Sequence, residues 1–139
     1  MKFNRVLRYC FYFFSLWWIA CNKPEVDHHR RRIDYIRKIP GKNSPIQLEA
    51  VQKGEALISY SDCYTCHKED KESVGPAFKD IAERYPAQPV YIDLLAQKII
   101  SGGKGSWGNA TMSSHPKVSM EEAKLMVSYI LSFKTDSIN

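Results

Sequence analysis

The sequence has no apolar run long enough to cross a lipid bilayer. Its longest such run, from Tyr9 to Ala20, has twelve residues, and a helix of that length extends about 18 Å, well short of a hydrocarbon core about 30 Å thick. The sequence also has no internal repeat and no sustained alternation of apolar and polar residues. We therefore expect one small helical domain with no β-sheet and no membrane-spanning helix.

Excess positive charge is missing from most of the chain, although the net charge is +5. Residues 1–20 contain three basic residues and no acidic one, and residues 21–48 contain seven basic and three acidic residues. Residues 49–139 are left with ten basic and twelve acidic residues, a net charge of −2. Because the basic surplus lies outside the expected folded part, we predict no nucleic-acid binding.

The N-terminal segment has the layout of an export signal. Three basic residues precede the apolar run, which ends just before Cys21 and a polar stretch. This junction resembles the cleavage site of bacterial lipoproteins, although Trp18 stands where leucine is usual. The resemblance implies that residues 1–20 are removed and that Cys21 carries the lipid; ordinary signal cleavage and an uncleaved signal anchor are the alternatives. A basic, flexible tether over residues 21–44 then leads to a domain over residues 45–139.

One pair of closely spaced cysteines is present, and a histidine follows it directly. Cys63-Tyr64-Thr65-Cys66-His67 has the C-x-x-C-H pattern of a c-type haem attachment site. Two thiols at this spacing can each form a thioether to a haem vinyl group, and the imidazole can then bind the iron. Zinc sites and thiol oxidoreductases share the C-x-x-C part. The sequence has neither the second cysteine pair expected of a structural zinc site nor a βαβ pattern, which favours haem.

Helical periodicity and capping residues predict about four helices. The first is expected from Ser44 to about Tyr60, and the last begins at a capping box formed by Ser119 and Glu122. We expect these two helices to cross at Gly54, where the missing side chain leaves room for Tyr129. Two shorter helices are expected between them, opened by Gly75-Pro76 and by Pro89.

In this order, the features resemble a small bacterial class I cytochrome c over roughly residues 47–134. They are the glycine-containing first helix, C-x-x-C-H, Val74-Gly75-Pro76, Gly103-x-Gly105-x-Trp107-Gly108, Met112 and the aromatic-bearing last helix. The resemblance implies an all-α cytochrome c fold, with about four helices around one covalently attached haem c.

The resemblance also implies a role for each site residue. Cys63 and Cys66 attach the haem, and His67 is the proximal iron ligand. The Pro76 carbonyl accepts a hydrogen bond from the other ring nitrogen of His67, which fixes the ring. Met112 is the distal ligand through its sulfur. The last expected site residue, near a haem propionate, is Trp107.

The sequence contains a second candidate for the distal iron ligand. Met112 stands alone in a loop of small and polar residues, whereas Met120 and Met126 belong to the last helix, where methionine usually fills the core. His115 follows three residues after Met112, and a bis-histidine site has a lower potential. Relatives commonly stiffen this loop with prolines, but two serines follow Met112 here, which leaves the firmness of the iron–sulfur bond open.

Two axial ligands leave no position on the iron for a substrate, so the resemblance implies a one-electron carrier and not an enzyme. We expect it in a respiratory or dehydrogenase chain on the periplasmic side of a bacterial membrane, anchored through Cys21. Its partners are then a redox donor and acceptor, such as an oxidase, reductase or dehydrogenase. The alternative is a peroxidase-like haem enzyme or sensor with a displaceable distal Met112.

Overall fold

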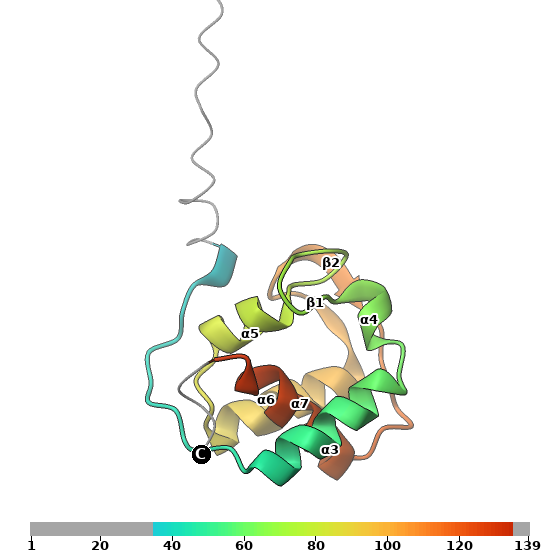
Figure 1. Ribbon diagram of the computed structural model, residues 1–139. Helices are drawn as coiled ribbons and strands as arrows, with labels where there is room; N and C mark the ends of the chain where they lie inside the picture. Colours follow the sequence, from blue (N-terminus) through green and yellow to red (C-terminus); the bar gives the residue numbers. More distant parts are fainter. Residues whose placement is uncertain (1–34, 135–139) are drawn as a thin grey trace, which may run out of the picture. The chain divides into compact units, whose positions relative to one another are not determined.

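The computed structural model describes residues 35–134, and Figure 1 shows their arrangement. The predicted signal peptide and Cys21 lie outside the described residues. Helices make up about half of the described part and strands only a small share, which confirms the prediction of a helical fold. The elements, in chain order, are α3 (Leu48–Ser59), α4 (Cys63–Cys66), α5 (Phe78–Arg84), α6 (Pro89–Ser101), β1 (Gly103–Gly105), β2 (Gly108–Met112) and α7 (Met120–Ser132).

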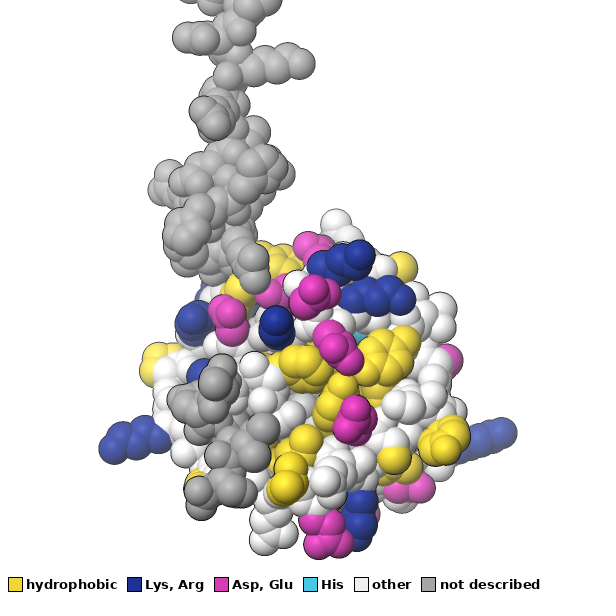
Figure 2. Space-filling view, viewed as in Figure 1, with side chains coloured by type: hydrophobic (Ala, Val, Ile, Leu, Met, Phe, Trp, Pro, Cys, Tyr) yellow, Lys and Arg dark blue, Asp and Glu magenta, His cyan; other side chains and the backbone are white. Residues whose placement is uncertain are grey.

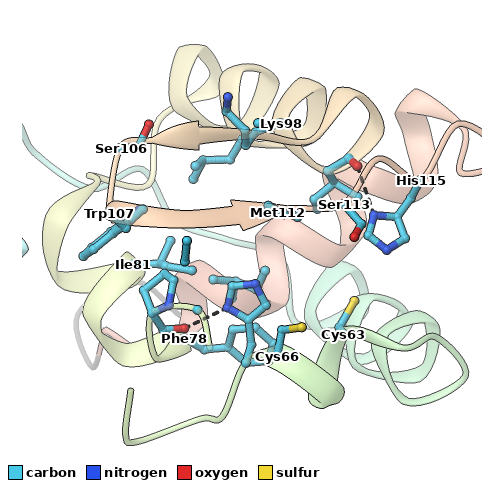
Figure 3. A pocket seen from close by; sticks show the side chains of 18 of the residues that line it. Cys63, Cys66, Phe78, Ile81, Lys98, Ser106, Trp107, Met112, Ser113 and His115 are labelled. Carbon is cyan, nitrogen blue, oxygen red and sulfur yellow. Dashed lines mark hydrogen bonds between the residues drawn. The ribbon is translucent and has the colours of Figure 1, made fainter. Parts of the chain in front are cut away.

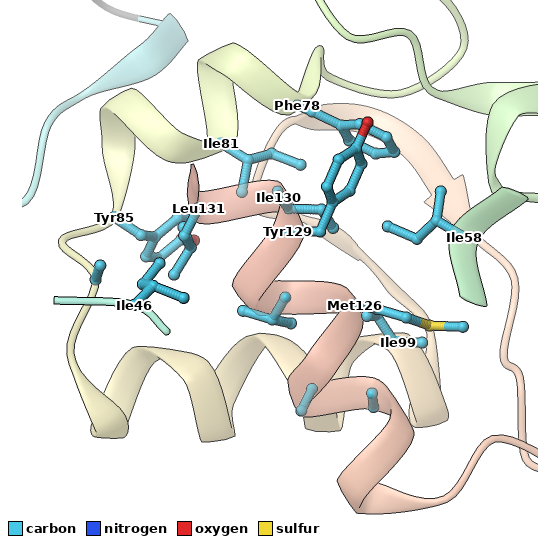
Figure 4. Close-up of a cluster of buried hydrophobic side chains, with 14 of the residues drawn as sticks. Ile46, Ile58, Phe78, Ile81, Tyr85, Ile99, Met126, Tyr129, Ile130 and Leu131 are labelled. Carbon is cyan, nitrogen blue, oxygen red and sulfur yellow. The ribbon is translucent and has the colours of Figure 1, made fainter. Parts of the chain in front are cut away.

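Helix α7 is the element around which the others assemble, because it packs against α3, α5 and α6. Its start is fixed by the predicted capping box. The Ser119 side chain accepts a hydrogen bond from the Glu122 N–H, and the Glu122 carboxylate accepts one from the Ser119 N–H. Figure 4 shows the apolar side chains that meet in this core, among them Ile58, Phe78, Ile99 and Ile130. Burying each of them contributes roughly 1.5–3 kcal/mol.

Helices α3 and α7 cross at Gly54, as predicted from the sequence. A Cβ atom at Gly54 would lie 2.0 Å from the Leu125 carbonyl oxygen and 3.0 Å from Cβ of Tyr129. The backbone of α7 therefore lies so close to Gly54 that a residue with a side chain would not fit at this position. Sequence reasoning identified the aromatic neighbour but not the closer contact with the α7 backbone.

The β1–β2 hairpin corrects the expectation of a fold without a sheet. The two strands pair antiparallel, with Gly103 opposite Met112 and Gly105 opposite Gly108. These three glycines have φ values of 136°, 94° and 88°, which other residues rarely adopt. The strand residues are exposed or half-buried, so no alternation of apolar and polar residues marks them in the sequence. The hairpin places Trp107 in its turn and Met112 at its end.

The first predicted helix begins later than expected. Helix α3 starts at Leu48 with Gln47 as its N-cap, not with Ser44. The Ser44 N–H instead donates a hydrogen bond to the Ala87 carbonyl at 2.6 Å, and Ile46 is only 6% exposed. Contacts with the chain that follows α5 therefore override the local capping signal of Ser44-Pro45.

Residues 35–44, which the sequence analysis assigns to a flexible tether, pack against the domain. Ile36 is only 4% exposed, and the Ile39 N–H donates a hydrogen bond to the Arg84 carbonyl at 2.8 Å. We call residues 35–46 the N-terminal strap. The folded part thus begins before residue 45, because the apolar side chains within the basic stretch find a surface to cover.

The face of the molecule seen in Figure 2 carries charges of both signs. Acidic side chains lie on and beside a stripe of apolar side chains, and basic side chains lie mainly above it and toward the edges of this view. This mixture agrees with the slight negative charge that the sequence gives residues 49–139.

Candidate cofactor-binding site

A cavity of about 350 Å³ contains the site residues expected from the sequence (Figure 3). Its walls are mostly apolar, as is typical of cofactor pockets, and come from α3 to α7 and the hairpin. The apolar part includes Ile58, Phe78, Leu95, Ile99, Val127 and Ile130. The structure brings six predicted site residues to this one cavity: Cys63, Cys66, His67, Pro76, Trp107 and Met112.

The two cysteines belong to the single helical turn α4. Cys63 and Cys66 are its first and last residues, so the i,i+3 spacing puts their side chains on the same side of the turn. Both thiols are free, and Figure 3 shows their sulfur atoms along one edge of the cavity. Two unpaired thiols at one edge of an apolar cavity are suited to a double covalent attachment.

The His67 ring is held from three directions. Its Nδ1 lies 2.8 Å from the Pro76 carbonyl oxygen, which can only accept, so we assign the proton to Nδ1 and leave Nε2 with a lone pair. A Cβ atom at Gly75 would lie 2.7 Å from His67 Cε1, and the Phe78 ring stacks at 5.6 Å between centroids. Tautomer and orientation are therefore both fixed for a metal at Nε2.

Met112 is positioned by the end of the hairpin and by the end of α6. Gly102, with φ of 67°, is the C-cap of α6, and a Cβ atom there would lie 2.6 Å from the Met112 carbonyl oxygen. This close approach fixes the Met112 backbone beside α6. Met126 also lines the cavity and is 3% exposed; its helical spacing assigned it to the core, and the structure makes it a cavity residue as well.

Trp107 carries two contacts that the sequence analysis missed. The Arg84 guanidinium lies 4.5 Å over its ring, and Arg84 Nη1 donates a hydrogen bond to the Ser106 carbonyl at 2.5 Å. The Tyr35 ring meets Trp107 edge-on, with 5.1 Å between centroids. Burial, followed by the nearby Glu72 carboxylate, raises the pKa of Tyr35 to about 12. No local motif links Tyr35, Arg84 and Trp107, which come from the strap, α5 and the hairpin.

The haem-attachment motif is tied to α7 by a pair of tyrosines. The hydroxyls of Tyr64 and Tyr129 both donate to Glu69 Oε1, at 3.0 and 3.1 Å, and lie 3.2 Å from each other. Burial is the main cause that raises the pKa of both tyrosines, so their hydroxyls stay protonated. The turn that carries the cysteines is thereby held in place against the last helix.

The chemistry of this donor set fits a c-type haem. Two free thiols, an imidazole with Nε2 left over, and a thioether share one mostly apolar cavity, and these are the groups that attach and ligate such a haem. Within residues 35–134, no group of three His, Cys, Asp or Glu side chains is arranged to hold a metal ion. No helix in the same stretch is long and apolar enough to cross a membrane.

Comparison with known proteins identifies relatives of this chain. The family described as cytochrome c matches residues 51–134. Cytochrome c-551 of Azotobacter vinelandii is 40% identical over 83 residues, covering 60% of this chain and 100% of the relative. Cytochrome c-552 of Hydrogenobacter thermophilus is 39% identical over 80 residues, covering 58% and 81%. The crystal structure of wild-type Nitrosomonas europaea cytochrome c552 matches with a TM-score of 0.54 and 36% identity, covering 58% of this chain and 99% of that chain.

Proposed function

The chain belongs to the cytochrome c family, and from this membership we propose that Cys63 and Cys66 hold its haem c through thioether bonds. It is a monohaem c-type cytochrome that carries electrons and is not an enzyme. When bound, the haem supplies an iron that alternates between the ferric and ferrous states. Family membership supports haem over the zinc and thiol-exchange interpretations of C-x-x-C-H.

His67 and Met112 are proposed as the two axial ligands. The observation that carries this proposal is the 2.8 Å hydrogen bond from His67 Nδ1 to Pro76, which leaves Nε2 for iron. Met112 lines the same cavity, and a thioether stabilises the ferrous state and raises the potential. Trp107 is proposed to donate its indole N–H to a propionate, and the Arg84 guanidinium, 4.5 Å over the Trp107 ring, would add a positive charge near such a group.

The electron is proposed to pass between a donor and an acceptor protein of a respiratory or dehydrogenase chain outside the cytoplasmic membrane. Two axial side chains leave the iron no free position, which suits outer-sphere transfer. The described residues favour no particular partner, so an oxidase, a reductase or a dehydrogenase remains the class of partner proposed.

A pyridine haemochrome spectrum combined with a redox titration tests this function. We expect one c-type haem per chain and a single reversible one-electron wave. The native ferrous protein is expected to bind CO slowly, because Met112 must leave first. Rapid CO binding, or turnover with peroxide, would contradict the closed site and support a haem enzyme or sensor.

Attachment to the membrane through a lipid on Cys21 is a separate proposal. The basic residues, the short apolar run and the Ala20-Cys21 junction support it. In the full chain, Cys21→Ala is expected to abolish acylation and to move the protein from the membrane to the soluble fraction. The matched control is Cys10→Ala, which changes a cysteine within the leader and is expected to leave processing unchanged. A Cys21→Ala protein that is still acylated and membrane-bound refutes the lipid anchor.

A further inference from the structure

His115 is a third side chain at the cavity, after His67 and Met112, whose chemistry allows it to bind iron. It lines the cavity together with His67 and Met112, and Figure 3 shows it at the end where Cys63 lies. Its backbone N–H is hydrogen-bonded to the Ile99 and Ile100 carbonyls at 3.2 and 3.1 Å. His115, the alternative distal ligand identified in the sequence, is thus held by its backbone at the end of α6.

Both ring nitrogens of His115 face acceptors. Nδ1 lies 3.2 Å from the Ile99 carbonyl oxygen, and Nε2 lies 3.1 Å from Oδ1 of Asp62. Neither a carbonyl nor a carboxylate can donate, and a neutral imidazole has one N–H to give; we assign it to Nε2, because the Asp62 carboxylate is the stronger acceptor. An Nε2 that donates its proton to Asp62 has no lone pair left for a metal, and the remaining nitrogen, Nδ1, faces the Ile99 carbonyl.

The partner of Nε2 is the residue next to the haem-attachment motif. Asp62 directly precedes Cys63, and its carboxylate makes no capping hydrogen bond to α4. Its side chain is 74% exposed, so its removal opens no cavity in the core. The contact of Asp62 with His115 therefore joins the distal loop to the attachment turn without an evident role in the fold of either.

We propose that Asp62 selects the distal ligand: by engaging His115 Nε2, it keeps this imidazole off the iron and leaves the position to Met112. The inference rests on the proposed ligation by His67 and Met112. The distal loop needs such a device, because two serines follow Met112 where prolines would stiffen the chain. Asp62 is in this sense a positioning residue that acts through His115.

The test compares Asp62→Ala with wild type as full-length, haem-loaded protein. Ferric haem with a methionine ligand has a weak near-infrared charge-transfer band. In Asp62→Ala we expect this band to lose most of its intensity, the ferric spectrum to become that of a bis-histidine haem, and the midpoint potential to fall. The double variant Asp62→Ala/His115→Asn is expected to recover the band and the potential, since asparagine cannot replace the imidazole on iron.

Asp70→Ala is the matched control. Asp70 is also exposed and follows the motif closely, so this variant removes the same charge from the same region and is expected to keep the full band. Asp62→Ala with an unchanged band and potential overturns the selection by Asp62. So does a double variant that fails to recover, because the loss then has a cause other than His115. A wild-type protein without the band instead overturns ligation by Met112, and the selection with it.

Discussion

Replacing Met112 with alanine is expected to abolish the near-infrared charge-transfer band of the ferric protein and to lower its midpoint potential. The axial ligand can shift haem potentials over a range of about 0.8 V, so we expect a fall on the order of 100 mV. The physical reason is the loss of the thioether, which favours ferrous over ferric iron. The vacated position should also bind CO rapidly in the ferrous state, whereas the wild type should not.

Met126 provides the matched control for this experiment. Its thioether lines the same cavity but is buried in the core on α7, where leucine has nearly the same volume and costs little stability. Met126→Leu is expected to keep the band and to leave CO binding slow. A band that survives Met112→Ala and disappears in Met126→Leu would reverse the assignment of the distal ligand.

Replacing Gly54 with alanine is expected to lower the free energy of unfolding of the haem-loaded protein by about 3 kcal/mol. A new Cβ atom would lie 2.0 Å from the Leu125 carbonyl oxygen. This neighbour is backbone within α7 and cannot rotate away, so the two helices must separate. Denaturant titration measures the change, and the midpoint should fall without loss of the attached haem.

Glu55→Ala is the control variant. It distinguishes the steric clash at Gly54 from any general effect of an alanine substitution in α3 on stability. Glu55 follows Gly54 directly and is exposed, so its replacement should change the free energy of unfolding by less than about 0.5 kcal/mol. If Gly54→Ala is as stable as Glu55→Ala, the close crossing of α3 and α7 is wrong.

The sequence predicted those parts of the fold that depend on local or strongly patterned signals. The capping box at Ser119 needs only two residues of one helix turn, and it is present. The crossing at Gly54 was predictable because a glycine inside an amphipathic helix is costly unless another element needs the space. The meeting of C-x-x-C-H, Pro76 and Met112 at one cavity could also be predicted, because their order along the chain resembles that of a known fold.

The rest depends on contacts between segments that no local pattern connects. The β1–β2 hairpin has no apolar alternation, because its residues are exposed or half-buried and its glycines serve backbone conformation. Ser44 has the chemistry of an N-cap, yet its N–H bonds to Ala87. The pairing of Asp62 with His115 joins residues that are 53 positions apart. Such contacts become visible only when the packing of α3, α6 and α7 is known.

The N-terminal strap determines how the domain responds to mechanical load from its N-terminal side. Tension on the chain ahead of residue 35 acts first on the contact between Tyr35 and Trp107 and on the buried Ile36. Next in line is the hydrogen bond from Ile39 to Arg84. Helix α3 and its crossing with α7 come only after residue 46. A pull from this end therefore first peels the strap, residues 35–46, from the domain before it reaches the helices around the haem cavity.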